Sequence, residues 1–244
     1  MHSGSPLMRS LFLVVTCLFI AANSARADKN NKFEINLSRY KGNSSAYFIR
    51  AMDAWDKNNM AAARQLLDAA IKDDSALWPA YLMRAQVWVR FGKYNEALQD
   101  CNAAARLKPQ FTRTFIVRAH IYRALGRCAE GVADLDKVIA IHSTPESVAF
   151  ALSSRAWLRA NCQNTAVHDP KKALEDAIRA CKLDGWHMAD YVDTLALACA
   201  VNGDFESAIK YQKQAIASGR FEPGELKEAE SHLDYYEKHQ GHKR

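Results

Sequence analysis

The sequence lacks the short motifs that most enzyme classes need around a reacting atom. It has no glycine-rich phosphate loop, no His-Glu-x-x-His, no Gly-x-Ser-x-Gly and no Cys-x-x-Cys. Histidines gather near the C-terminus at His232, His239 and His242, and Cys162 lies close to His168, but neither set has the ligand spacing typical of zinc. We therefore expect no catalytic residue, no metal site and no cofactor.

A strong excess of one charge is also missing. Lys and Arg number 33 against 27 Asp and Glu, which gives a formal charge of +6 at pH 7. The basic residues are spread along the chain, whereas nucleic-acid binding requires a basic stripe or a recognised motif. Nucleic acid is therefore not expected as a partner.

The chain has no apolar run long enough for a membrane span, which needs roughly 20 residues. The longest run extends from Leu11 to Ala22, with Arg9 before it and the small-x-small sequence Ala25-Arg26-Ala27 behind it. These features predict a secretory leader, residues 1–27, and an exported protein that is periplasmic or extracellular. An uncleaved anchor is the alternative. Cleavage leaves 217 of the 244 residues, a formal charge of +4 and no integral membrane span.

Cysteine is present in an odd number after cleavage, so the cysteines cannot all pair within one chain. Cys101, Cys181 and Cys199 fall on apolar helix faces, where a free cysteine acts as a small hydrophobic side chain. Cys128 and Cys162 fall at turns between helices of adjacent units. They are the pair to test for a disulfide.

Residues 78–111 read as two amphipathic helices that meet around a glycine turn. Gly92 can adopt the left-handed conformation that ends a helix, and Pro109 stops the second helix. Spacings of three and four residues place two sets of side chains on one face each. These sets are Tyr81, Ala85 and Trp88 in the first helix, and Ala97, Cys101 and Ala104 in the second.

This unit resembles the tetratricopeptide repeat (TPR) family, whose repeats are about 34 residues long. The resemblance rests on the small, turn and stop residues Ala85, Gly92, Tyr94, Ala97, Ala104 and Pro109. It implies an all-α fold, a right-handed solenoid of helical hairpins, which binds other protein chains. It also implies a scaffold without catalysis.

The pattern repeats along the chain and divides it into successive segments. The predicted units are residues 44–77, 78–111, 112–145, 149–188 and 189–222, with an insertion in the turn of the fourth. A flexible N-terminal arm, residues 28–43, precedes them, and a capping helix, residues 223–238, shields the last apolar face before the tail 239–244. We expect eleven helices and no sheet. The last two units also resemble the closing repeats of exported bacterial TPR proteins of the planctomycete type.

An arginine stands immediately before the first small alanine of four units, at Arg50, Arg84, Arg118 and Arg155. Aspartates occupy one fixed place on the second helix of three units, at Asp100, Asp134 and Asp176. In the fifth unit both are replaced together, by Leu195 and Tyr211. We therefore predict structural ion pairs within the second, third and fourth units. A ladder of anion ligands is the alternative, and Arg50 breaks the rule because Leu66 stands opposite it.

In TPR arrays the first helices line a concave groove, so the resemblance implies ligand-groove residues at fixed positions. These positions hold Phe48, Met52, Trp55, Leu82, Gln86, Arg90, Arg113, Ile116, His120, Arg123 and Trp157. The set combines apolar area with basic residues, so we expect a protein or peptide partner that is acidic and carries apolar residues. The chaperone-binding TPR type is disfavoured, because Phe48, Met52 and Met83 replace its lysine and asparagine. The alternative is that Phe48 and Trp55 are buried under the N-terminal arm.

Two functions fit this sequence. The first is a non-catalytic exported adaptor that binds a protein segment in its concave groove. The second is a structural or assembly component of a cell-envelope complex that acts through its outer surface or its capping helix. Hidden enzymatic activity in the inserted turn would need a bound metal or cofactor.

Overall fold

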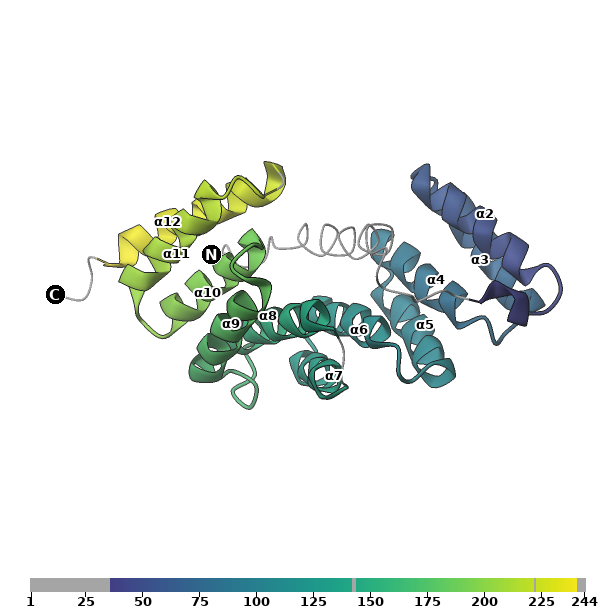
Figure 1. Ribbon diagram of the computed structural model, residues 1–244, viewed down its shortest axis with the longest axis horizontal. Coiled ribbons are helices and arrows are strands. Elements are labelled where there is room, and N and C mark those ends of the chain that lie inside the picture. Colours follow the sequence, from purple (N-terminus) through teal and green to yellow (C-terminus); the bar gives the residue numbers. More distant parts are fainter. Residues whose placement is uncertain (1–35, 142–143, 222, 241–244) are drawn as a thin grey trace, which may run out of the picture. The chain divides into compact units, whose positions relative to one another are not determined.

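The computed structural model describes residues 36–141, 144–221 and 223–240 (Figure 1). Within these residues the chain forms eleven α-helices and one short 3-10 helix, and no strand. The predicted all-α fold of stacked helical hairpins is confirmed. The predicted leader and residues 28–35 of the arm lie outside the described residues. The chain divides into two compact units, residues 1–125 (unit 1) and 126–244 (unit 2), each of which is described by itself.

Unit 1 contains two hairpins and one further helix. Figure 1 shows the two hairpins packed side by side. The elements are η2 (Leu37–Arg39), α2 (Ser44–Asp56), α3 (Met60–Asp73), α4 (Trp78–Arg90), α5 (Tyr94–Leu107) and α6 (Thr112–Ala124).

Unit 2 contains one helix, followed by two hairpins and a last helix. The elements are α7 (Cys128–Ala140), α8 (Pro145–Asn161), α9 (Pro170–Asp184), α10 (Ala189–Val201), α11 (Phe205–Ala217) and α12 (Pro223–Gln240). Helix α8 begins earlier than residue 149, where the sequence places the fourth unit. The Thr144 hydroxyl accepts a hydrogen bond from the Ser147 backbone N–H at 3.3 Å, and Pro145 fits the first turn, so both residues favour the earlier start.

The turn inside each regular hairpin needs one residue with a positive φ. Gly92, Gly126 and Gly203 supply it at φ 69°, 69° and 79°. In the first hairpin Asn58 takes the same place at φ 57°, and asparagine is a side chain that tolerates this region. The turns therefore keep one geometry although the residue changes.

Small residues fill the places where helices cross most closely. Ala85, Ala97 and Ala104 are fully buried, and so are the side chains of Cys101 and Cys181. Burial raises the pKa of Cys181 to about 12 and that of Cys199 to about 11. These cysteines therefore stay protonated near neutral pH and act as packing residues.

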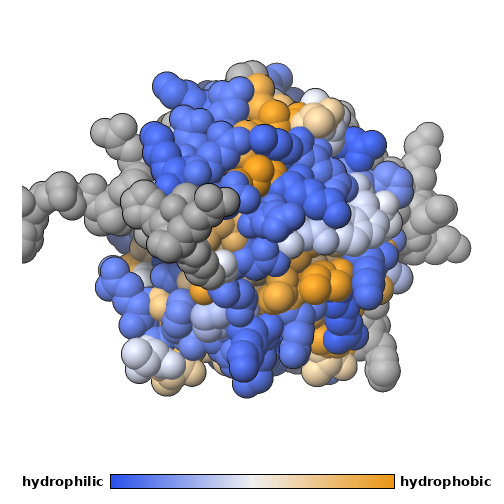
Figure 2. Space-filling view, turned by 90° about the vertical axis from the view of Figure 1, so that its left-hand side faces the viewer, coloured by the Kyte–Doolittle hydropathy of each residue, from blue (hydrophilic) through white to orange (hydrophobic). Residues whose placement is uncertain are grey.

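Helix α12 is the last helix of the described residues. It packs on α11, and Ala229 and Tyr236 on one of its faces are each 2% exposed. Figure 2, which views the molecule from this end, shows a mostly hydrophilic surface interrupted by small hydrophobic areas. This is the arrangement that a terminal helix needs to shield the last core.

The described part of the N-terminal arm is held in place, which differs from the expected loose segment. The backbone N–H of Lys41 donates to the Asp74 carboxylate at 2.8 Å, and the Ser45 hydroxyl donates to the Leu37 carbonyl at 2.6 Å. Tyr40 packs against both hydrophobic cores of unit 1. The sequence shows no helical period here because the contacts are capping bonds and single apolar anchors.

Candidate interaction surfaces

Arg84 on α4 forms a bidentate ion pair with Asp100 on α5. Its Nε and Nη2 groups donate to the two carboxylate oxygens at 2.8 and 2.7 Å, and its Nη1 donates to Asp68 at 2.8 Å. Burial opposes the charge on Arg84, but the bonds and attraction from Asp100 and Asp68 outweigh it and raise its pKa. These contacts use the guanidinium inside the fold, so Arg84 is not an anion ligand.

Arg155 on α8 repeats this arrangement in unit 2. Its Nε and Nη2 donate to Asp176 at 2.8 and 2.7 Å, its Nη1 bonds Asp136, and Arg159 adds a bond to Asp176 at 2.5 Å. Arg155 is therefore also occupied within the fold. Arg50, which has no aspartate opposite it in the sequence, is exposed.

Each of these arginines also reaches the second helix of the preceding hairpin, a contact that the sequence reading missed. Arg84 binds Asp68, Arg155 binds Asp136, and Arg118 Nη1 donates to Asn102 at 2.8 Å. Asp68, Asn102 and Asp136 follow one another at intervals of 34 residues, so the signal is present in the sequence. Arg118 and Asp134 belong to different units, and their pairing stays a prediction.

The predicted groove positions of unit 1 differ widely in exposure. Five of them are buried, and Phe48 and Leu82 belong to the hydrophobic cores. The five are Phe48, Leu82, Gln86, Ile116 and His120, with exposures between 4% and 9%. These side chains do not form the open apolar floor that the resemblance implies.

The remaining predicted residues of unit 1 form what we call the first-helix face, defined by Met52, Trp55, Arg90, Arg113 and Arg123. Met52 is 46% exposed. The Arg90 guanidinium lies 5.7 Å from the centre of the Trp55 ring, which joins α2 to α4 through a cation–π contact. The face therefore offers apolar, aromatic and cationic groups on three consecutive first helices.

Arg113 on α6 is a half-buried cation of this face. Burial lowers its pKa to about 10, and no carboxylate of the described residues lies within ion-pair distance of it. His120 on the same helix has a pKa lowered to about 3, by burial and then by the charge of Arg123, so it is neutral at pH 7. The face is therefore positive, and an anionic group on a partner would remove part of the cost of burying Arg113.

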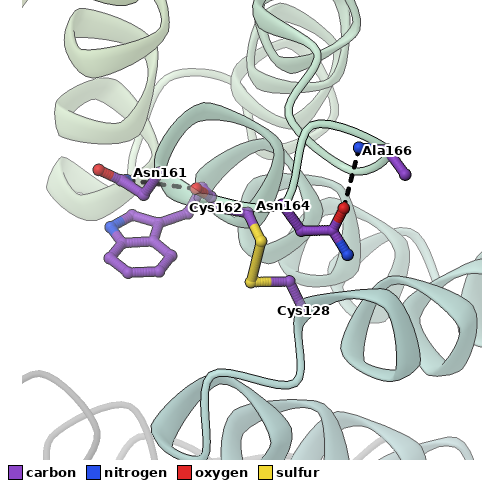
Figure 3. The surroundings of a disulfide bond; sticks show 6 residues. Cys128, Asn161, Cys162, Asn164 and Ala166 are labelled. Carbon is purple, nitrogen blue, oxygen red and sulfur yellow. Dashed lines mark hydrogen bonds between the residues drawn. A yellow bond between two sulfur atoms is a disulfide. The ribbon is translucent and has the colours of Figure 1, made fainter.

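In unit 2 the predicted residue Trp157 is half-buried on α8, and its carbonyl accepts a hydrogen bond from Asn161 Nδ2 at 3.2 Å. The residue after this turn of helix, Cys162, forms a disulfide with Cys128 at the start of α7 (Figure 3). The two Cα atoms are 6.3 Å apart. The disulfide ties the inserted turn, residues 162–169, to the neighbouring helix.

Helix α10 carries an acidic set that the sequence reading missed. Burial, followed by the charges of Glu225 and Asp193, raises the pKa of Asp190 to about 7. Asp193 accepts a hydrogen bond from Gln212 Nε2 at 2.7 Å and lies 3.3 Å from His232 Nδ1. Asp190 and Asp193 occupy in the fifth unit the positions that hold groove residues in earlier units, so continuing the pattern by one unit could have found them.

The described residues contain no group of three or more histidine, cysteine or acidic side chains that could hold a metal ion. Cys162 is used in the disulfide and His232 contacts Asp193. None of the helices in this part of the chain is long and apolar enough to span a membrane.

Comparison with known proteins identifies the repeat. Residues 50–110 match the tetratricopeptide repeat family. DnaJ homolog subfamily C member 3 from Rattus norvegicus is 32% identical over 139 residues, which are 54% of this chain and 25% of that protein. The chain thus spans about a quarter of the length of this curated relative.

Two solved structures show the same fold at low identity. PilW, a widely conserved type IV pilus biogenesis factor, superposes with a TM-score of 0.66 at 17% identity, over 83% of this chain and 92% of its own. YrrB, a TPR protein with an unusual peptide-binding site, superposes with a TM-score of 0.56 at 20% identity, over 70% of this chain and 84% of its own. The likeness concerns the arrangement of helices.

Proposed function

We propose that this chain is a non-catalytic exported adaptor, because residues 50–110 match the tetratricopeptide repeat family and such repeats mediate protein–protein interactions. Its partner is an acidic protein segment that also carries apolar residues, and the segment binds on the first-helix face of unit 1. The structural relative YrrB has a peptide-binding site, which makes a peptide ligand compatible with this architecture.

The observation that carries the proposal is Arg113. Arg113 is half-buried, burial lowers its pKa to about 10, and within the described residues no carboxylate lies within ion-pair distance of its guanidinium. A buried charge is normally compensated by a partner. Trp55 and Met52 supply apolar area on the same face, so one segment with an acidic and an apolar residue would satisfy both requirements.

Export is supported by two independent features. The leader pattern of residues 1–27 has the order of charge, apolar run and small residues that secretion requires. The disulfide between Cys128 and Cys162 fits an oxidising compartment, because cytosolic thiols are kept reduced. The resemblance of the last two repeats to exported planctomycete proteins agrees with this setting. Mass spectrometry of the mature protein tests it, and an N-terminus after Ala27 is expected.

Affinity purification from the native source after chemical crosslinking tests the binding proposal. Arg113→Glu reverses the charge at the proposed contact, so it should abolish recovery of the partner. Arg106→Glu changes an exposed arginine on the second helix α5 and serves as the matched control. Equal loss of the partner in both variants would contradict a site on the first-helix face.

A second candidate function is a component of an envelope assembly that acts through α12. Tyr235 is 49% exposed on this helix, and its ring centre lies 4.0 Å from that of His239. Exposed aromatic side chains of this kind favour interfaces. Tyr235→Ala should release the partner if this function holds, whereas the adaptor proposal expects no change.

A further inference from the structure

A pocket of about 340 Å³ lies in unit 2 between the α9–α10 turn and the C-terminal half of α11. Its floor is formed by the buried residues Ala189, Val192 and Ala215, and its rim by exposed polar and aromatic side chains. The volume is at the low end of small-molecule sites, so it suits one residue-sized group. None of its lining residues belongs to the first-helix face of unit 1.

Trp186 forms one wall of this pocket in a strained backbone conformation. Its φ is 66°, in the left-handed region that bulky residues adopt only at a cost in backbone free energy. The indole is still 38% exposed, so burial does not repay this cost. The ring stacks on Tyr211 with centres 6.0 Å apart and planes at 21°. A strained backbone that keeps an aromatic side chain exposed favours a ligand-binding surface.

Several hydrogen bonds hold the turn in this conformation. The Trp186 N–H donates to the Cys181 carbonyl at 2.9 Å, and the Met188 N–H donates to the Asp184 carboxylate at 2.6 Å. His187 Nδ1 lies 2.5 Å from the Asp184 carbonyl oxygen, and because a carbonyl can only accept, Nδ1 donates this hydrogen bond. The rigid turn therefore fixes the indole relative to the rim.

Arg220 supplies the charge of the pocket. Its Nη1 donates to the His187 carbonyl, which leaves further N–H donors of the guanidinium for another group. No acidic side chain lines the pocket, and no carboxylate of the described residues pairs with Arg220. Gln214 and Ser218 add neutral polar groups at the rim. An apolar floor beside an arginine is complementary to an anion attached to a small apolar body.

We propose that this pocket binds a carboxylate carried on a single aromatic or branched apolar group. The apolar group lies on the floor against the Trp186 indole, and the carboxylate accepts hydrogen bonds from Arg220. Such a ligand is either a free small carboxylic acid or the C-terminal residue of a polypeptide.

The test titrates the whole mature protein with N-acetyl-phenylalanine, its C-terminal amide and phenylacetate. The readout is the indole N–H signal of Trp186 in a ¹H–¹⁵N correlation spectrum, assigned with Trp186→Phe. Ligands of this size bind with a Kd of about 1 mM, and the neutral amide should bind at least about tenfold more weakly than the acid. Binding of phenylacetate as tightly as N-acetyl-phenylalanine identifies a free acid as the source, and binding of the latter alone identifies a chain end.

Variants separate the roles of the two main residues. Arg220→Gln should weaken binding of the acid by at least about tenfold and leave the amide unchanged, whereas the exposed control Lys182→Gln should have no effect. Trp186→Gly relieves the strained φ and should abolish binding without lowering the melting temperature. Equal affinity for acid and amide, no saturable shift, or marked destabilisation by Trp186→Gly would overturn the proposal. Loss of the partner on Arg113→Glu bears only on the first-helix face.

Discussion

The guanidinium of Arg84 donates two nearly parallel hydrogen bonds to Asp100, which is 5% exposed, and a third bond to Asp68 on the preceding hairpin. One side chain therefore joins the second helices of two consecutive repeats. Arg155 does the same with Asp176 and Asp136. In this protein Arg84 and Arg155 each connect two consecutive hairpins.

Removal of either Arg84 or Asp100 alone should lower the free energy of unfolding. We expect Arg84→Met to lower the free energy of unfolding by about 3 kcal/mol, because it leaves the Asp100 carboxylate buried without its cation. Arg84→Met combined with Asp100→Leu should recover most of the loss, since the fifth unit carries Leu195 and Tyr211 at these places. Chemical denaturation followed by circular dichroism measures both. If Arg84→Met is as stable as the control Arg106→Met, the pair contributes nothing to the fold.

The disulfide should stabilise unit 2. Cys128 and Cys162 are 34 residues apart, so chain-entropy arguments give about 4 kcal/mol for closing the loop, with strain and residual structure reducing it. Reductant should lower the melting temperature of the wild type. It should have no further effect on Cys128→Ser with Cys162→Ser, which already lacks the bond. A wild type whose melting temperature ignores reductant would show that the bond carries no stability.

Asp190 should make the stability of unit 2 depend on pH. Its pKa of about 7 in the fold exceeds the value of 3.8 for a free aspartate, mainly because of burial. The folded state therefore holds the proton more tightly, and stability falls as the pH rises from about 4 to 7. His232 and Glu228, whose pKa values are also raised, act in the same direction.

Thermal unfolding at pH 4.5 and pH 8 measures this effect. We expect Asp190→Asn to raise stability at pH 8 by about 1–2 kcal/mol after solvent screening and to flatten the pH profile. The control is Asp234→Asn, which changes an exposed residue of α12. An unchanged profile in Asp190→Asn would assign the pH dependence to the other groups.

The sequence predicts the hairpins well because alanine, glycine and proline mark the closest packing, the turns and the ends in every repeat. It also points to Arg84 with Asp100, since both recur at fixed places. The second partners were missed because the comparison stayed within one hairpin, although Asp68, Asn102 and Asp136 recur with the same interval. Met52 is exposed and Phe48 is buried because of the rotation of α2 about its axis, and the Trp186 pocket depends on a strained turn. Neither feature produces a periodic pattern in the sequence.

Once a partner is identified, salt and a single aromatic residue should act on different rate constants. Higher salt should lower the association rate, because Arg90, Arg113 and Arg123 steer an acidic segment over long range. Trp55→Ala, on the same face, should instead raise the dissociation rate, because lost apolar contacts act mainly on dissociation. Surface plasmon resonance separates the two. A partner whose rates ignore both changes does not use these residues.

The central claim is that the first-helix face of unit 1 holds a partner segment, and site-specific photocrosslinking in the native compartment tests it most directly. A photoreactive amino acid is placed at Met52, which is 46% exposed on α2, and in a separate variant at Gln99, which is exposed on the second helix α5. The account predicts that Met52 crosslinks to an acidic segment with apolar residues and that Arg113→Glu abolishes this product, while Gln99 gives none. Crosslinks to the same partner from Gln99 but not from Met52 would contradict it.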